Sequence, residues 1–263
     1  MEFFKTLWKN RKLVLKLGKS DFKNRFASTS LGSMWGFLQP FVFMMMYVIV
    51  FQFIFKSTGE HGEPYVVWFL PGMAMWMCLN DNIMGASGAI RAYSYLVKKV
   101  VFPIDVIPMI SIVGNSIVSL FLFVIAIVVC AIWGHFVNIF EFIYVIIAAY
   151  AFIIALTRFT SAVTTLVPDF SNLLGIIMQV FLWATPVIWG ISQLANHPTI
   201  ASIIKCMPFA YLVTATRETI MGGDIITANH GLYTIVFWAI TIFLYCWGNH
   251  VFKNRKKDFA DVL

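Results

Sequence analysis

The sequence predicts an all-α integral membrane protein, and three observations support that fold class. The chain of 263 residues is 60% hydrophobic and only 12% charged, whereas a soluble protein averages roughly 25% charged residues. Apolar runs long enough to cross a bilayer recur along the chain. The net charge of +7 gathers in the N-terminal arm, one internal loop and the C-terminal tail, which indicates a cytoplasmic lipid surface and no nucleic-acid partner. We expect one membrane domain over residues 1–263.

The first 26 residues predict an amphipathic helix that lies in the headgroup plane. At 100° per residue, aromatic and apolar side chains fall in a narrow stripe, and lysines cluster on one flank of it. The stripe holds Phe4, Trp8, Leu15, Phe22 and Phe26, and the flank holds Lys5, Lys9, Lys12, Lys16, Lys19 and Lys23. The arm is either a positive-inside anchor alone or an anchor that also meets a charged lipid headgroup.

The first predicted span is Leu31–Phe55, which carries no charged side chain. As a helix it would be about 37 Å long, enough to cross a bilayer. It begins with the polar and kink-prone residues Trp35, Gln39 and Pro40. The loop that follows, residues 56–64, has no positive bias, so we expect it to face outward.

The second predicted span, Tyr65–Ile90, carries the acidic residue Asp81 about two-thirds of the way along it. A carboxylate at membrane depth is costly and should face another helix or a wet cavity. The sequence leaves open whether Asp81 makes a structural hydrogen bond or takes part in transport.

The segment Arg91–Pro108 (RAYSYLVKKVVFPIDVIP) is strongly basic and lies between two apolar runs. Short basic loops resist translocation, so this one is expected on the cytoplasmic side. Within it, Tyr93–Val101 is too short to span a membrane, and Pro103 ends the helix that it predicts. A short, stiff, amphipathic helix between two spans is an element on which a soluble partner could push.

Four further spans are predicted: Ile107–Trp133, Phe142–Val167, Leu173–Ile191 and Leu232–Phe252. Arg158 lies near the inner end of the fourth span of the chain, where its side chain is expected to extend to the headgroups.

Residues 192–230 are irregular and hold two apolar pieces divided by Pro208. Each piece is shorter than the roughly 17 residues that a span requires. A basic tail follows the last span, and six spans keep that tail on the same cytoplasmic side as the N terminus. The prediction is therefore six transmembrane helices, both termini in the cytoplasm, and an external re-entrant hairpin between the fifth and sixth spans.

The sequence lacks the motifs of a self-sufficient enzyme or pump. It contains no phosphate-binding loop of the G-x-x-x-x-G-K-[ST] type, no zinc-protease motif and no nucleophile elbow. The cysteines and histidines show no metal-ligand spacing. We therefore predict no catalytic residue and no metal site, and a source of energy outside this chain.

Several stretches together resemble a known family. They are FKNRFASTSLGSMWGFLQP at Phe22–Pro40, LVKKVVFPIDVIP at Leu96–Pro108, the Asp-containing turn and aromatic run of Val167–Pro186, and the basic ending Arg255–Ala260. In order along the chain, they are similar to the membrane subunits of polysaccharide-exporting ABC transporters, which export O-antigen, capsule or teichoic acid. The chain departs from that pattern at Pro168, where the family commonly has Arg, and at Met207, where it often has Asn.

The resemblance implies a homodimer bound to two copies of a cytoplasmic ATP-binding subunit in a bacterial cytoplasmic (inner) membrane. It places ATP and Mg²⁺ on the partner, leaves this chain without a cofactor, and makes the cargo a polyprenyl-diphosphate-linked glycan. Residues 91–106 would form the segment that couples the chain to the ATPase, through Arg91, Tyr93, Tyr95, Leu96, Lys98, Lys99, Phe102 and Pro103. Lys23 and Arg25 would lie at the entrance for the lipid headgroup. The candidates for a conduit or gate are Trp35, Gln39, Asp81, Trp183, Pro186 and Pro208.

Three alternatives remain at this point. The same fold could export another cargo, such as a drug, a peptide or an ordinary lipid. The chain could instead be a polytopic membrane enzyme acting on lipid-linked sugars, with Asp81 or Asp169 as its acid or base. A passive channel would need no ATPase and would tolerate a scrambled Arg91–Pro108 loop.

Overall fold

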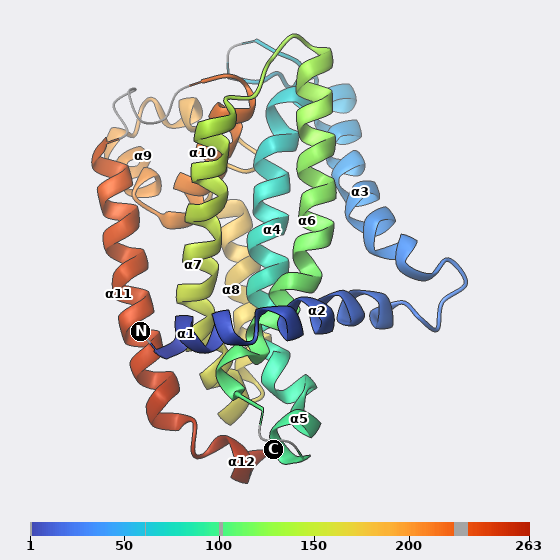
Figure 1. Ribbon diagram of the computed structural model, residues 1–263. Coiled ribbons are helices and arrows are strands. Elements are labelled where there is room, and N and C mark those ends of the chain that lie inside the picture. The colour runs from blue at the N-terminus through green and yellow to red at the C-terminus, as the bar shows by residue number, and fades with distance from the viewer. Residues whose placement is uncertain (1, 61, 100–101, 224–230) are drawn as a thin grey trace.

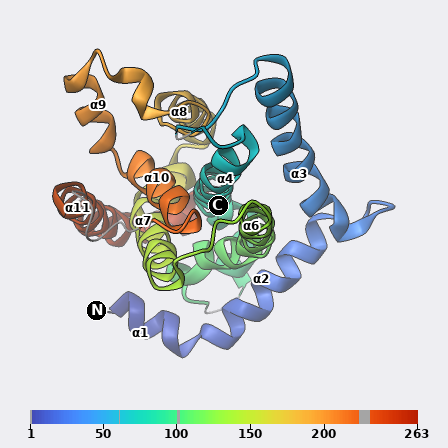
Figure 2. The same ribbon diagram turned by 90° about the horizontal axis from the view of Figure 1, so that it is seen from above.

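The computed structural model describes residues 2–60, 62–99, 102–223 and 231–263. Over these ranges the chain is helical, without a β-strand, which confirms the predicted all-α class. Most of the long helices run side by side in one bundle, and the N-terminal helices cross the outside of that bundle (Figures 1 and 2).

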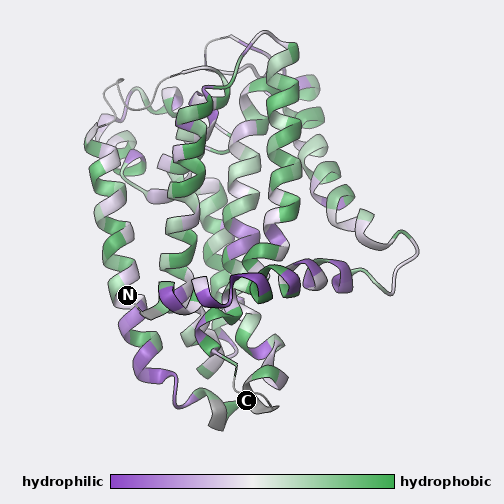
Figure 3. Ribbon diagram, viewed as in Figure 1, coloured by the Kyte–Doolittle hydropathy of each residue, from purple (hydrophilic) through white to green (hydrophobic). Residues whose placement is uncertain are grey.

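The N-terminal arm forms α1 (Glu2–Lys9) and α2 (Arg11–Arg25). Along α2 the buried residues are Val14, Gly18 and Phe22, which follow one another at the four-residue spacing of a single helix face. Figure 3 shows that hydrophilic residues concentrate on this arm and at the C-terminal end of the last long helix. The arm is thus helical, in two pieces. Of the predicted apolar stripe, Phe4, Trp8 and Leu15 are exposed and Phe22 is buried, so the amphipathic interfacial helix stays a prediction.

The first half of the bundle begins with the 3₁₀ turn η1 (Gly32–Met34) and α3 (Trp35–Val48), which continues as a π-helical segment, η2 (Ile49–Ile54). The long helix α4 (Tyr65–Ala92) then lies at the centre, against α3, α6, α7, α8 and α10 (Figure 2). Most of its residues are buried, because neighbouring helices cover every side of it.

The predicted coupling segment, residues 91–106, contains α5 (Ser94–Lys99) and the 3₁₀ turn η3 (Ile104–Val106). The predicted short helix is therefore present, although it is shorter than Tyr93–Val101. Residues 100 and 101 lie outside the described part of the chain. The long helices α6 (Ile107–Ile132) and α7 (Ile139–Leu166) follow.

The second half comprises α8 (Phe170–Ala184), the 3₁₀ turn η4 (Ile191–Leu194), α9 (Pro198–Lys205), α10 (Pro208–Ile220), α11 (Gly231–Arg255) and α12 (Phe259–Val262). The helices α9 and α10 bend by 86° at their junction. Pro208 opens α10, because a proline fits the first turn of a helix but cannot continue the preceding one. A pair bent this far fits both a broken span and a re-entrant loop. Residues 224–230 of the predicted hairpin lie outside the described chain.

Four described helices are long and apolar enough to cross a membrane: Gly32–Ile54, Ile104–Ile132, Ile139–Leu166 and Gly231–Arg255. A fifth is added if the bent pair α9–α10 counts as one span. The helix α8 has 15 residues, fewer than the roughly 17 needed to cross the hydrocarbon core. The chain is therefore a multi-pass membrane protein, and the count of six spans stays a prediction.

Candidate functional site

A cavity of about 420 Å³ lies where α2, α3, α4 and α6 meet. Three residues singled out in the sequence line it: Arg25, Gln39 and Asp81. The sequence assigned Arg25 to a headgroup entrance and the other two to a conduit, and the structure brings all three into one place. The full lining is Phe22, Arg25, Phe26, Gly36, Gln39, Pro40, Phe43, Met77, Asp81, Met84, Gly85, Asn115 and Val118.

Glycines allow the helices around this cavity to approach closely. A Cβ atom on Gly18 of α2 would lie 2.5 Å from Val113 Cγ1 of α6 and 2.9 Å from the backbone oxygen of Ile110. A Cβ atom on Gly114 would lie 2.8 Å from Asp21 Oδ2. Small residues at helix contacts let backbones come together in membrane proteins. The close contact between α2 and α6 therefore places the C-terminal end of α2, with Arg25, at the cavity.

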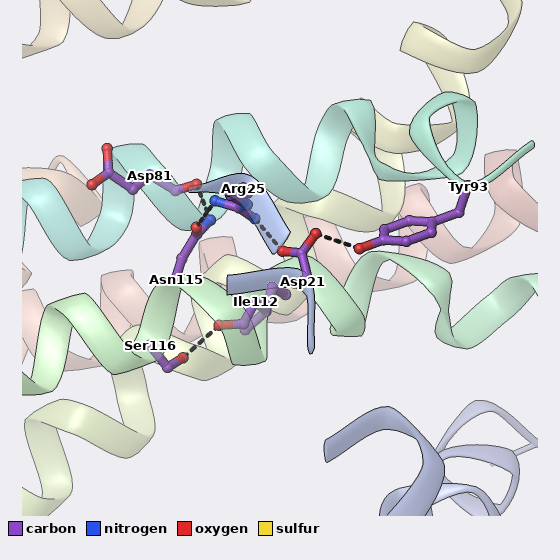
Figure 4. A network of polar contacts seen from close by, with 7 residues as sticks. All are labelled: Asp21, Arg25, Asp81, Tyr93, Ile112, Asn115 and Ser116. Atoms are coloured by element: carbon purple, nitrogen blue, oxygen red, sulfur yellow. Dashed lines mark hydrogen bonds and ion pairs between the residues drawn. The ribbon is translucent and has the colours of Figure 1, made fainter. Parts of the chain in front are cut away.

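Arg25 is held by one carboxylate and one amide (Figure 4). Its Nη2 donates to Asp21 Oδ2 at 2.5 Å, and its Nη1 donates to Asn115 Oδ1 at 2.5 Å. Asn115 Nδ2 in turn donates to the backbone oxygen of Asp81 at 2.6 Å. The Arg25 side chain is 37% exposed, and a guanidinium has five N–H donors. It can therefore take an incoming anion.

The same network reaches the coupling segment. The Tyr93 hydroxyl donates a hydrogen bond to Asp21 Oδ1, so the two oxygens of one carboxylate contact Tyr93 and Arg25 (Figure 4). Burial raises the pKa of the Tyr93 hydroxyl above its usual value, and the hydrogen bond to the Asp21 carboxylate raises it further. Tyr93 therefore stays protonated and remains a donor.

The two ends of the coupling segment are fastened in different ways. At its start, Arg91 Nη1 donates to the backbone oxygen of Thr165 at 3.0 Å. Tyr95 of α5 is exposed, as a contact with a soluble partner requires. Leu96 is partly buried, Phe102 packs against the core, and Pro103 precedes η3. The backbones of Lys98 and Lys99 belong to α5, but their side chains lie outside the described residues.

The far end is fastened by Arg158, whose side chain was predicted to extend outward to the headgroups. The side chain is instead buried between helices and only 1% exposed. Its Nη2 donates to Asp105 Oδ1 at 3.3 Å and to Asn249 Oδ1 at 2.8 Å. Its guanidinium also lies 4.0 Å from the ring centre of Phe252 and 4.5 Å from that of Phe3. The reason is that α1, α7, α11 and η3 meet here and supply a carboxylate and two aromatic faces.

Four other predicted residues do not line the cavity: Trp35, Trp183, Pro186 and Pro208. Trp35 and Trp183 are exposed on α3 and α8. The backbone oxygen of Pro186 accepts a hydrogen bond from Arg217 Nη2 at 3.0 Å. Lys23 is exposed on α2 and does not line the cavity either. The structure therefore divides the predicted site residues among several places.

Sequence reasoning missed Asp21, Asn115 and Arg217. The four-residue spacing of Asp21 and Arg25 on one helix was an available signal for a pair. Asn115 is an amide inside a long apolar run, and Arg217 is a cation inside an apolar piece. Intramembrane polar residues of this kind mark buried partners or functional sites.

Chemically, the cavity presents a guanidinium beside amides and a carboxylate. A guanidinium suits phosphate oxygens, and amide and carboxylate groups can hydrogen-bond hydroxyl groups. Among the residues that the structure describes, no group of three or more His, Cys, Asp or Glu side chains could hold a metal ion. The arrangement is suited to binding an anionic, hydroxyl-rich headgroup.

Comparison with known proteins supplies the family context. The ABC-2 type transporter family model matches residues 12–221. An O-antigen export system permease protein RfbA of Myxococcus xanthus is 22% identical over 97% of this chain and 96% of its own length. Two such permeases of Klebsiella pneumoniae are 21% and 20% identical, each over 95% of both chains.

Proposed function

Because the chain belongs to the ABC-2 type transporter family, we propose that it is the membrane subunit of an ATP-driven exporter of a lipid-linked polysaccharide. The cargo would be of the O-antigen or teichoic-acid type, carried across a bacterial cytoplasmic membrane. Relatives named as O-antigen export permeases match it over nearly their whole length, and the sequence resembles the same class.

The Arg25 cavity is the observation that carries this proposal. Arg25 lies where the amphipathic arm meets the bundle, and such a position suits the charged end of a lipid that enters from the leaflet. Its guanidinium would bind the diphosphate of a polyprenyl-linked glycan. Gln39, Asp81 and Asn115 would bind sugar hydroxyls beside it.

The topology that we propose has six spans. Four are the helices that length and hydropathy identify, and the other two are α4 and α8. The arm α1–α2 lies in the inner headgroup plane, and the bent pair α9–α10 forms an external re-entrant hairpin. This arrangement puts the basic arm, the coupling segment and the basic C-terminal tail on one cytoplasmic side, as the positive-inside rule favours.

Membership of the family implies an ATP-binding partner. We propose two copies of this chain with two ATP-binding subunits, which hold ATP and Mg²⁺, and no cofactor on this chain. The helix α5 would seat on the ATPase. Support for this contact comes from the exposed Tyr95 ring, 53% accessible, and from the basic residues that follow it.

The first test is purification of the full chain from its native membrane in mild detergent. A stoichiometric soluble subunit with ATPase activity is expected to copurify. A chain that purifies alone, without ATPase activity, would instead favour the enzyme or the channel.

A second test addresses the coupling segment. Tyr95→Asp, or Lys98→Glu together with Lys99→Glu, should abolish export while the assembled complex is still recovered. Tyr95→Phe is the matched control and should export normally, because it keeps the ring. Normal export by the charge-changing variants would refute the role assigned to residues 91–106.

A further inference from the structure

One carboxylate connects the cavity with the coupling segment. Asp21 Oδ2 accepts from Arg25 Nη2 at 2.5 Å, and Asp21 Oδ1 accepts from the Tyr93 hydroxyl. Arg25 lines the cavity, and Asp21 and Tyr93 do not. Figure 4 shows the three side chains in a row, with Asp21 in the middle. Any change in how Arg25 is bound therefore acts on the carboxylate that also holds Tyr93.

The side chains of Arg25 and Asp21 differ in exposure, and this difference would let Arg25 exchange Asp21 for a ligand. The Arg25 side chain is 37% exposed, whereas that of Asp21 is 14% exposed. Arg25 is thus the more accessible member of the pair, and it lines the cavity whereas Asp21 does not. In the absence of a ligand, Asp21 occupies the position of an anion on Arg25.

A diphosphate would compete with Asp21 for that guanidinium. It carries more negative charge than a carboxylate and offers several acceptor oxygens, so its charge-assisted hydrogen bonds with Arg are stronger. Two anions on one guanidinium also repel each other. Asp21 Oδ2 lies beside α6, at 2.8 Å from where a Cβ atom on Gly114 would stand, and Asp21 Oδ1 accepts from Tyr93. Its displacement therefore acts on the Tyr93 hydroxyl.

Tyr93 is the residue at which such a change enters the coupling segment. It caps the C-terminal end of α4, and its backbone oxygen accepts from Leu96 N–H of α5 at 2.9 Å. The far end of the segment stays fastened, because Asp105 contacts both Arg158 and Lys256. Loss of the Asp21–Tyr93 bond would therefore loosen the near end, where the Arg91–Thr165 contact remains, and leave the far end in place.

We propose that Asp21 is an internal stand-in for the phosphate of the cargo, and that its displacement from Arg25 releases Tyr93 and signals an occupied cavity to the ATPase. Asp21 and Tyr93 are then positioning residues that couple loading to ATP hydrolysis. This inference rests on the proposed function, since it needs an anionic cargo and an ATP-binding partner.

The test uses the complete complex of this chain with its ATP-binding subunits in lipid nanodiscs. The probe is undecaprenyl diphosphate, and undecaprenol is the uncharged control. Two quantities are measured: the Kd of the probe, and the ratio of probe-stimulated to basal ATP hydrolysis for each variant. The variants are Asp21→Asn and Tyr93→Phe. The control is Asp258→Asn, which removes a carboxylate from an exposed ion pair with Arg255 outside the cavity.

Asp21→Asn should bind the probe more tightly, by up to about tenfold, because Arg25 loses its competing anion. Its ratio of stimulated to basal hydrolysis should nevertheless fall to about one. The amide can still accept from the Tyr93 hydroxyl but no longer pairs with Arg25, so binding of the probe to Arg25 no longer acts on Tyr93. Tyr93→Phe should keep the Kd within about twofold and lose the stimulation as well. Asp258→Asn should match the wild type in both quantities. A merely structural defect would weaken binding instead of strengthening it.

Weaker binding by Asp21→Asn, or normal stimulation in Tyr93→Phe, would overturn the stand-in role and leave the proposed function intact. Equal stimulation by undecaprenol would overturn it too, because the phosphate would then be unnecessary. A wild-type complex that does not bind the probe would overturn both the inference and the proposed function.

Discussion

Arg25 and Arg217 lie in different regions of the bundle and differ in what holds them. Arg25 is 37% exposed and contacts one carboxylate and one amide. Arg217 is 5% exposed; it donates to the backbone oxygens of Trp68, Pro186 and Val187, and its guanidinium lies 3.6 Å from the Trp68 ring centre. The same residue type thus serves as an accessible cation in one place and as a structural fastener in the other. The two arginines differ because a ligand could replace the partners of Arg25, whereas the partners of Arg217 are buried backbone oxygens.

The packing around Arg217 supports its structural role. A Cβ atom on Gly72 of α4 would lie 2.5 Å from Arg217 Nη2, so only a glycine leaves room for the guanidinium there. Arg217 ties α10 to α4 and to the chain that follows α8. It therefore fixes the bent pair α9–α10 on the bundle.

The largest expected effect is on stability, from Arg217→Met. The change leaves three backbone oxygens without their donor and removes a buried cation–π contact, which we estimate at about 3 kcal/mol of unfolding free energy. Thermal unfolding of the purified chain in detergent measures it. An unchanged melting temperature would contradict the structural role.

Arg158 sharpens the comparison, because it has a carboxylate partner like Arg25 but is buried like Arg217. If burial determines how much an arginine stabilises the fold, Arg158→Lys should destabilise the chain by about 2 kcal/mol. Lysine lacks the planar guanidinium that contacts Asp105 and Asn249. The N-terminal arm should also become easier to cleave, because Phe3 packs on the guanidinium. Limited proteolysis and thermal unfolding check both effects. Wild-type stability would show that the partner type matters more than burial.

Arg25→Gln tests the accessible cation. Stability should change by less than about 1 kcal/mol, as for an exposed ion pair. Affinity for a diphosphate lipid should fall by about tenfold or more, because a charge-assisted contact is lost. Lys23→Gln, which removes a charge two residues earlier on the same helix, is the control and should change affinity by less than about twofold. Equal losses in the two variants would indicate a general surface-charge effect.

The smallest expected effect comes from Asp81→Asn. The amide keeps hydrogen-bonding capacity toward hydroxyl groups, so export should fall by less than about fivefold. A membrane enzyme that uses Asp81 as its acid or base would lose nearly all activity. An export assay in cells, normalised to the amount of chain in the membrane, distinguishes the two. Complete loss with normal chain levels would favour the enzyme.

The sequence by itself determined the all-α class, the membrane character and the positions of most helices. Apolar run length, the distribution of lysine and arginine, and prolines are local features that act within one segment. The break at Pro208 and the short helix after Arg91 could be predicted for that reason. Gln39 and Asp81 could be singled out as polar residues within apolar runs, whereas Arg25 was singled out through the resemblance to the exporter family.

The tertiary structure decided which of these residues meet. Asn115 is 90 positions from Arg25, and Tyr93 is 72 positions from Asp21, so no local pattern could pair them. Their contacts depend on how closely α2 crosses α6, which the glycines at Gly18 and Gly114 allow. Arg158 shows the same limit: depth in a span predicted a side chain among the headgroups. Three other segments, α1, η3 and α11, instead supply its partners, because a buried charge is stable only where the fold brings such groups together.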